Sequence, residues 1–278
     1  MRELTLGYSP CPNDTFIFYG LVNNIISSPD IQFKEVLEDV ETLNQMANRS
    51  QLDITKISYH AFGHLFDRYC LLRSGGALGK GCGPLVVARE QIAIRDLKNR
   101  IIAIPGKMTT AYLLLQIFDP SFRDNVVFMP FHEIIDAVRK GQCDAGLIIH
   151  ESRFTFQKAA LKQVIDLGEW WEQETGLPIP LGAIIAKRDL GNNTIHTVER
   201  MVRESLAYAC AHRDEPKAYI KNHAQELSDD VIDRHISLYV NDYSLDIGEE
   251  GIQAVKELFR RAEKLSILEK ADLPLFAD

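Results

Sequence analysis

Polar and apolar residues alternate near the start of the chain, in ELTLGY (3–8), and a largely apolar helical stretch follows in TFIFYGLVNN (15–24). The order of strand, loop and helix then recurs, with further apolar strand-like runs at 52–57, 101–106 and 144–149. Strands that alternate with helical stretches indicate a mostly parallel sheet covered by helices. The pattern predicts an α/β protein, with helices on both faces of mixed, mostly parallel sheets.

Two parts of the chain resemble each other at a constant offset. A predicted helix at 40–48 precedes SQLDITKIS, and a predicted helix at 131–140 precedes GQCDAGLII. Gln51 and Asp53 of the first part align with Gln142 and Asp144 of the second, and Tyr59 aligns with His150. The similarity is weak, because both pieces are helix-turn-strand units, but it suggests two related halves.

A pair of apolar segments suggests how the halves are joined. GPLVVARE (83–90) and PLGAIIAKRD (180–189) both contain Pro-Leu, run apolar and end in charged residues. If these two segments lie side by side, they form a hinge between the two halves. We therefore expect a large domain of residues 1–90 and 181–278, which the helical C-terminal part completes, and a small inserted domain of residues 91–180. A ligand would bind in the cleft between them.

Composition narrows the class of protein. The 278 residues carry a net charge of −8 and no Lys/Arg-rich run, which argues against nucleic-acid and anionic-membrane partners but not against a small anionic ligand. No apolar stretch approaches the roughly 20 residues of a membrane-spanning helix. The N-terminus enters a strand directly, and five widely spaced cysteines form no Cys-x-x-Cys pair. We expect free thiols and a cytoplasmic protein.

Polar residues collect where the predicted strands end, which is the edge where open α/β sheets bind ligands. They are Ser9, Asn13 and Asp14, then Lys56 and Ser58, then Thr109 and Thr110, and finally His150. A Ser or Thr at a helix start can be a simple cap, Lys56 can reach solvent, and a lone histidine can be structural. Four strand ends that carry such polar residues and face one cleft favour a site that binds an anion at helix N-termini.

Other motifs predict no cofactor or metal. His60 and His64 have metal-like i, i+4 spacing, but no third ligand or general-base glutamate accompanies them. The remaining histidines at 196, 212, 223 and 235 fall in polar helical stretches and are expected to be solvated. The glycine-rich stretch at 74–84 lacks the Ser/Thr of a phosphate-binding loop and has Pro84 where a dinucleotide motif needs glycine.

Six blocks of sequence carry a family resemblance: YSPCPNDTFIF, DITKISYHAFGHLFDRYCLLRSGGALGKGCGPLVVA, PGKMTTAYLLLQ, DAGLIIHESRFTF, LPIPLGAI and YVNDYSLDIGEEG. Together they resemble the 1,4-dihydroxy-6-naphthoate synthases, lyases of the futalosine route to menaquinone, over nearly the whole chain. The resemblance implies a two-domain, periplasmic-binding-protein-like (type II) fold and a cytoplasmic carbon-carbon lyase without cofactor.

The resemblance also implies roles for residues. The family's substrate, cyclic dehypoxanthine futalosine, would be bound by Lys56, Ile57, Ser58, Thr109 and Thr110, and its proton acceptor falls on His150. We expect His150 to be partly exposed in the cleft, opposite Lys56 and Ser58. The following Glu-Ser-Arg stands where the family has Glu-Gly-Arg, so this turn is expected to differ.

Two alternatives share the expected fold. One is a solute-binding protein without chemistry, which would normally be exported. The other is chorismate dehydratase, the sister enzyme of the same pathway, from which the LIIHE block (147–151) would separate this chain. The sequence leaves the oligomeric state open.

Overall fold

The computed structural model describes residues 2–224, 228–270 and 272–277. Its helices are α1 (Pro12–Val22), α2 (Val40–Asn48), α3 (Tyr59–Phe62), α4 (Thr110–Phe118), α5 (Ile134–Arg139), α6 (Ser152–Thr155), α7 (Leu167–Thr175), α8 (Asn192–Ala211), α9 (Lys217–His223), α10 (Asp229–Tyr239), α11 (Asp242–Leu245) and α12 (Gly248–Lys264). None of the described helices is long and apolar enough to cross a membrane.

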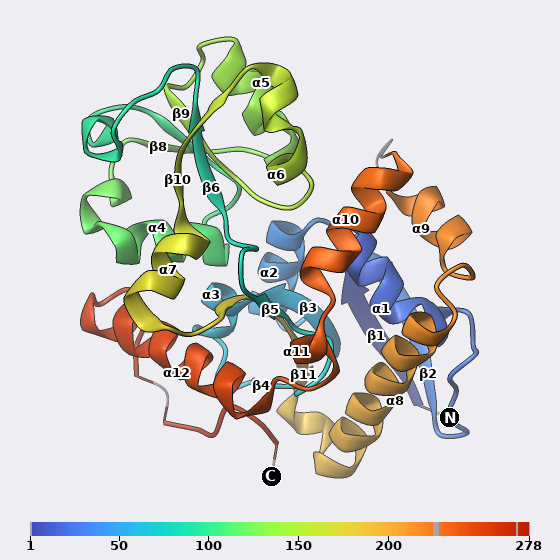
Figure 1. Cartoon of the computed structure of the whole chain (residues 1–278). Helices are drawn as coiled ribbons and strands as arrows, with labels where there is room; N and C mark the ends of the chain where they lie inside the picture. The colour runs from blue at the N-terminus through green and yellow to red at the C-terminus, as the bar shows by residue number, and fades with distance from the viewer. Residues whose placement is uncertain (1, 225–227, 271, 278) are drawn as a thin grey trace.

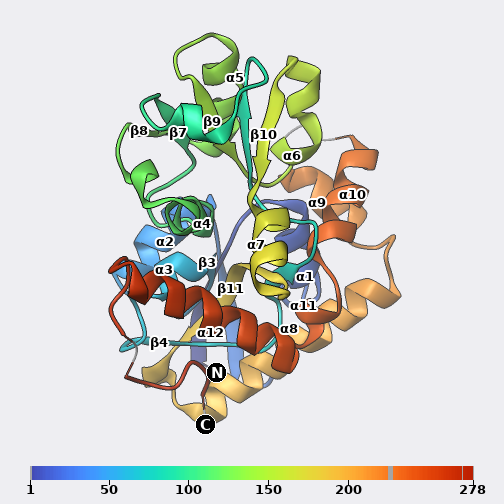
Figure 2. The ribbon, with the colours of Figure 1, turned by 60° about the vertical axis from the view of Figure 1, so that its left-hand side comes forward.

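The described strands form two sheets. The larger has the order β2 (Ile31–Leu37), β1 (Arg2–Tyr8), β3 (Ile54–Ser58), β11 (Ile179–Lys187), β4 (Tyr69–Leu71), with β5 (Ala77–Gly79) also paired to β11. The smaller has the order β10 (Lys162–Asp166), β6 (Leu85–Ala88), β9 (Ala145–Ile148), β7 (Ile102–Ile104), β8 (Val126–Phe128). Figures 1 and 2 show the smaller sheet, with α5 and α6, above the larger one.

Both sheets mix parallel and antiparallel pairs, as the sequence predicts, but the expectation of mostly parallel sheets is wrong, because four of the pairs among the described strands are parallel and five are antiparallel. In the larger sheet β1 is parallel to β2 and β3, whereas β11 runs antiparallel to β3, β4 and β5. In the smaller sheet β7 is parallel to β8 and β9, whereas β6 runs antiparallel to β9 and β10. Parallel pairs need long crossover connections, and helices such as α1 and α2 supply them.

The position of β6 differs from the expected pairing of segments 83–90 and 180–189. β6 pairs with β9 and β10 in the smaller sheet, and β11 lies in the larger sheet, so the two apolar segments belong to different sheets. A short apolar run suits a buried strand of either sheet, so its composition does not reveal which sheet takes it. The division of the chain into domains at residues 90 and 181 stays a prediction.

The chain passes between the sheets just before β6 and again just after β10, and these crossings touch. A Cβ on Gly83 would lie 2.3 Å from backbone atoms of Gly168, so only glycine permits this approach. The Leu167 N–H donates to the Pro84 carbonyl at 3.0 Å. The two crossings of the chain between the sheets therefore lie directly against each other.

Alternate side chains of β6 enter different cores. Val86 and Ala88 belong to a core that also contains Ala183 and Ile185 of the larger sheet, so this core continues from one sheet to the other. Leu85 and Val87 face the opposite side, in a core closed by α5. A third core packs α1 and α8 against the far face of the larger sheet. Period-two alternation thus places β6 between two apolar layers.

The weak internal repeat corresponds to a shared hydrogen bond. The Asp53 carboxylate accepts from the Thr5 N–H at 2.9 Å, at the start of the pairing between β1 and β3. The Asp144 carboxylate accepts from the Ile101 N–H at 2.9 Å, next to the pairing between β7 and β9. Both aspartates therefore connect the beginnings of two neighbouring parallel strands.

Candidate active site

A cleft of two connected parts lies where the sheets face each other. An outer groove of about 700 Å³ is lined by the starts of α1 and α2 on one side and by residues 128–132 and 150–151 on the other. An inner cavity of about 90 Å³ shares Ser9, Val40 and His150 with the groove. The inner cavity brings together every residue predicted for the site: Lys56, Ile57, Ser58, Thr109, Thr110 and His150.

Three helices of nine residues or more begin at this cleft. Cys11 and Asp39 are the N-caps of α1 and α2 and line the groove, and Thr109 is the N-cap of α4 and lines the inner cavity. The first N–H groups of a helix have no partner within it, and the helix dipole favours negative charge there. The starts of α1 and α4 therefore favour an anion or a hydroxyl, whereas at α2 the Asp39 carboxylate already accepts from the Glu41 and Thr42 N–H groups.

The two predicted cap residues differ. The Thr109 hydroxyl accepts from the Tyr112 N–H at 3.3 Å and so caps α4. Ser58 makes no side-chain cap for the four-residue α3. It is instead held by Asn44, whose side chain accepts from the Ser58 N–H at 2.9 Å and donates to the Ser58 hydroxyl at 3.2 Å. The interpretation of Ser58 as a simple cap is therefore wrong.

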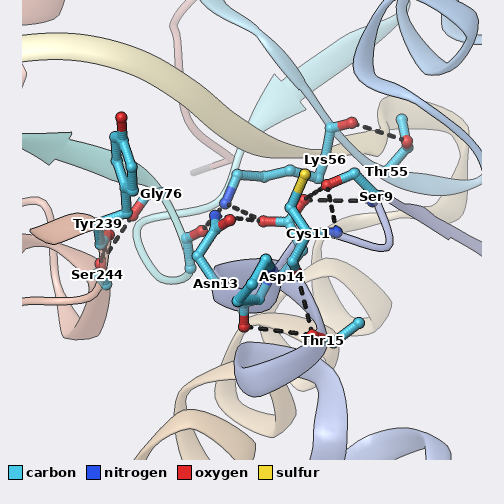
Figure 3. Close-up of polar contacts among 12 residues, drawn as sticks. Ser9, Cys11, Asn13, Asp14, Thr15, Thr55, Lys56, Gly76, Tyr239 and Ser244 are labelled. Carbon is cyan, nitrogen blue, oxygen red and sulfur yellow. Dashed lines mark hydrogen bonds and ion pairs between the residues drawn. The ribbon is translucent and has the colours of Figure 1, made fainter. Parts of the chain in front are cut away.

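Lys56 lies in a buried polar network and does not reach solvent. Its ammonium is 3.1 Å from the Asp14 carboxylate and donates to the Gly75 carbonyl at 2.7 Å. The Ser9 hydroxyl donates to the other Asp14 oxygen at 2.7 Å, and the Asn13 amide donates to Asp14 at 2.8 Å. Figure 3 shows this network at the start of α1. The network fixes the large-sheet wall of the cleft.

His150 follows β9 and occupies the opposite wall. Its φ of 55° is left-handed, a conformation that histidine adopts more readily than most side chains. As expected it is partly exposed, and it lines both the groove and the inner cavity. Its ring lies 5.1 Å from that of Phe131 and 6.3 Å from that of His235, and it forms no hydrogen bond with the described residues.

Burial lowers the pKa of His150, and the nearby Glu151 and Asp14 carboxylates oppose this shift. The imidazole is therefore neutral at pH 7, because its pKa lies below the ordinary value of about 6.5. A neutral imidazole facing a cavity can accept a proton. The arrangement can bind an anionic or hydroxyl-bearing molecule and remove a proton from it.

The expectation that His235 is solvated is wrong. Its side chain on α10 is 0% exposed, and neither ring nitrogen has a hydrogen-bond partner among the described residues. Burial, followed by the neighbouring His150, holds its pKa well below the usual range. The helical spacing of Ile232, His235 and Tyr239 places it on the apolar face of α10, and that spacing could have revealed its burial.

His60 is also buried, and it contributes to the shape of the site. Its Nδ1 lies 3.2 Å from the Thr109 carbonyl, so it joins α3 to the start of α4. Burial lowers its pKa to about 4, with a further contribution from His64, so it stays neutral. The described residues contain no group of three or more side chains that could hold a metal.

The turn after His150 is tied to both crossings between the sheets. The Arg153 guanidinium donates to the Gly83 carbonyl at 2.5 Å and to the Asp166 carboxylate at 2.6 Å. Ser152, at the position where the family has glycine, is buried and begins α6. Any change at the crossing point is thereby coupled to the segment that carries His150.

Comparisons with known proteins identify the family of this chain. Residues 4–264 match the family model described as menaquinone biosynthesis. A 1,4-dihydroxy-6-naphthoate synthase from Thermus thermophilus is 52% identical over 99% of this chain and 100% of its own length. One from Streptomyces coelicolor is 45% identical over 93% of this chain and 92% of its own.

Solved structures show the fold. A protein from Archaeoglobus fulgidus is 36% identical, with a TM-score of 0.90 over 96% of this chain and 98% of its own. The alkanesulfonate-binding protein of Xanthomonas axonopodis pv. citri, 14% identical, reaches a TM-score of 0.74 over 97% and 95% of the two chains. The fold is thus periplasmic-binding-protein-like, and the chain belongs to the menaquinone biosynthesis family, among the 1,4-dihydroxy-6-naphthoate synthases.

Proposed function

We propose that this enzyme converts cyclic dehypoxanthine futalosine into 1,4-dihydroxy-6-naphthoate, with His150 as the general base. The observation that carries the proposal is the placement of a neutral imidazole on one wall of the inner cavity, opposite a fixed polar network. The names of the two synthase relatives give the product, and the resemblance implies the substrate. The resemblance further implies a cytoplasmic enzyme that needs no cofactor.

The chemistry suits such a cleft. The substrate joins an aryl carboxylate and a ketone-bearing ring to a sugar remnant. Removal of an acidic proton and cleavage of the bond to the sugar carbon release the sugar remnant as a second product and let the bicycle become aromatic, which drives the reaction forward. His150 would take the proton, and Lys56, Ile57, Ser58, Thr109 and Thr110 would hold the substrate. Enclosure between the two walls would exclude water and fix the geometry.

Turnover by the purified protein tests the proposal. We expect 1,4-dihydroxy-6-naphthoate to form from cyclic dehypoxanthine futalosine, detected by chromatography and mass spectrometry, and no product to form from chorismate. Turnover of chorismate would instead show the sister dehydratase. Tight binding of the futalosine derivative without any turnover would show a binding protein, and either result would overturn the proposal.

A further inference from the structure

Asn13, in the first turn of α1, has a side-chain oxygen that no described residue satisfies. The residue is 5% exposed and lies in the wall of the inner cavity. Its Oδ1 is buried and without a hydrogen-bond partner within the described part of the chain. Buried polar atoms are nearly always hydrogen-bonded, so an unpaired acceptor on a residue of a cavity wall calls for a partner from outside the chain, which a ligand group or a water molecule in the cavity can be.

The network beneath Asn13 determines which atom of its amide is free. Asp14 forms an ion pair with Lys56, and a carboxylate in such a pair accepts hydrogen bonds but donates none. The amide must therefore turn its NH₂ group toward Asp14, and Nδ2 donates to Asp14 Oδ1 at 2.8 Å. A flipped amide would place two acceptors against each other. Figure 3 shows Asn13 beside Asp14 and Lys56.

The free atom sets the chemistry of its partner. Oδ1 can only accept a hydrogen bond, and the Asp14 carboxylate lies directly behind the amide. A ligand carboxylate would meet repulsion from both groups. A hydroxyl is neutral, donates one hydrogen bond and is small enough for an inner cavity of about 90 Å³.

We propose that Asn13 is a substrate-binding residue whose Oδ1 accepts a hydrogen bond from a substrate hydroxyl at the inner end of the cleft. Asp14 and Lys56 act as positioning residues that fix the amide orientation. The proposal rests on the proposed function, since it is the sugar remnant of that substrate that supplies hydroxyls. The substrate carboxylate then lies away from Asn13, at another part of the cleft.

The test combines one variant with altered substrates. Asn13→Leu keeps the approximate size of the side chain and removes the acceptor. Parent and variant are assayed with cyclic dehypoxanthine futalosine and with analogues that each lack one sugar hydroxyl. The control is Asn23→Leu, the same change at the exposed C-terminal end of α1, where the amide donates to the Tyr19 carbonyl.

We expect Asn13→Leu to lower kcat/KM for the full substrate about five- to tenfold, the range for loss of one uncharged hydrogen bond. One analogue should show a similar loss with the parent and no further loss with Asn13→Leu. Asn23→Leu should change neither value. The melting temperature is measured for each protein. Equal losses by Asn13→Leu on every analogue would give Asn13 a purely structural role and overturn the proposal.

The assays distinguish a failure of the proposed function from a failure of the proposal for Asn13. Turnover by the parent reports on the proposed function, and the dependence on one hydroxyl reports on Asn13. If Asn13→Leu does not fold, a crystal structure of the parent with a bound substrate analogue decides. A ligand hydroxyl within about 3.0 Å of Oδ1 supports the proposal. A carboxylate or an apolar group at that position overturns it.

Discussion

The two walls of the cleft hold their functional side chains in different ways. On the large-sheet wall, Lys56, Asp14 and Ser9 are buried and joined by an ion pair and hydrogen bonds. On the small-sheet wall, His150 has a left-handed backbone and a ring that contacts other rings but forms no hydrogen bond with the described residues. On the first wall the functional side chains themselves are held by polar bonds. On the second, packing and backbone conformation orient the His150 side chain, while Arg153 anchors the turn that follows it.

The difference matches the tasks proposed for the two walls. Groups that bind a substrate act best when they are fixed before it arrives. A base that bonded strongly to a neighbouring carboxylate would be held in its charged form, whereas His150 is kept neutral by burial. The contrast implies that changes on the two walls have separable consequences for stability and turnover.

The largest effect is expected from the polar wall. Lys56→Met leaves the Asp14 charge buried without its partner, and we expect the free energy of unfolding to fall by about 3–5 kcal/mol. Urea unfolding measures it. Lys80→Met is the control, because Lys80 pairs with Glu250 at the exposed surface at 3.3 Å, and such pairs contribute less than about 1 kcal/mol. Similar losses in both variants would contradict the idea of a stabilising wall.

On the opposite wall, His150→Asn should act on turnover. Asparagine retains some hydrogen bonding but no base of suitable pKa, so we expect kcat to fall at least ~100-fold. The melting temperature and substrate affinity should change little. His212→Asn, at an exposed position on the far end of α8, is the matched control. Near-parent turnover in His150→Asn would show that the base lies elsewhere.

The pH dependence of kcat/KM tests the same assignment of His150 as the base. Only neutral His150 accepts a proton, so kcat/KM should rise with pH through the pKa of His150 and level off above it. Burial lowers that pKa, which places the midpoint below about pH 6.5. Below the midpoint we expect a loss of about tenfold per pH unit. Initial rates at low substrate concentration measure the profile, and a midpoint above pH 7 would contradict the assigned environment.

His235 tests whether ring packing orients His150. His235→Phe keeps a flat ring and removes two unpaired buried nitrogens, so it should raise the free energy of unfolding by about 1 kcal/mol and retain turnover. His235→Ala opens space beside His150 and should lower kcat about tenfold, since small displacements of a reacting group are costly. Equal turnover in both variants would show that His150 needs no neighbouring ring.

The smallest effects are expected at the helix starts. Thr109→Ala removes a cap and should lower the free energy of unfolding by about 1 kcal/mol. Ser58→Ala removes no cap but takes a hydrogen-bond acceptor from the buried Asn44 amide, so it should lower the free energy of unfolding by a similar ~1 kcal/mol. Both should weaken substrate binding more than they reduce stability, which calorimetric titration and thermal melting compare. Unchanged affinity in both variants would leave Thr109 as a cap alone.

The elements and the grouping of the site can be predicted from the sequence, because both follow from local order along the chain. Strand ends of one sheet share an edge, so the positions of Ser9 and Ser58 at the ends of β1 and β3 are enough to place them close together. His150 follows a strand of the other sheet, and it lines the same cavity because the two sheets face each other there. The internal repeat is also informative, since Asp53 and Asp144 accept equivalent backbone hydrogen bonds.

The remaining features depend on contacts between distant segments. Lys56 is buried because Asp14 and Gly75 come to it from elsewhere in the chain, which no local pattern states. The helical spacing of α10 indicates that His235 is buried but not that its ring packs beside that of His150. The sheet that contains β6 depends on its pairing with β9 and β10. The composition of these segments alone is compatible with more than one arrangement.

The position of β11 has a consequence for protein synthesis. This strand lies between β3 and β4 in the larger sheet, yet it is translated after all five strands of the smaller sheet. On the ribosome the smaller sheet can therefore form while the edge of β3 that later pairs with β11 is still unpaired. Such an unpaired strand edge is prone to pair with other chains. Slow translation near residues 167–187 would lengthen this exposure, and a chaperone that covers strand edges would be needed most during that interval.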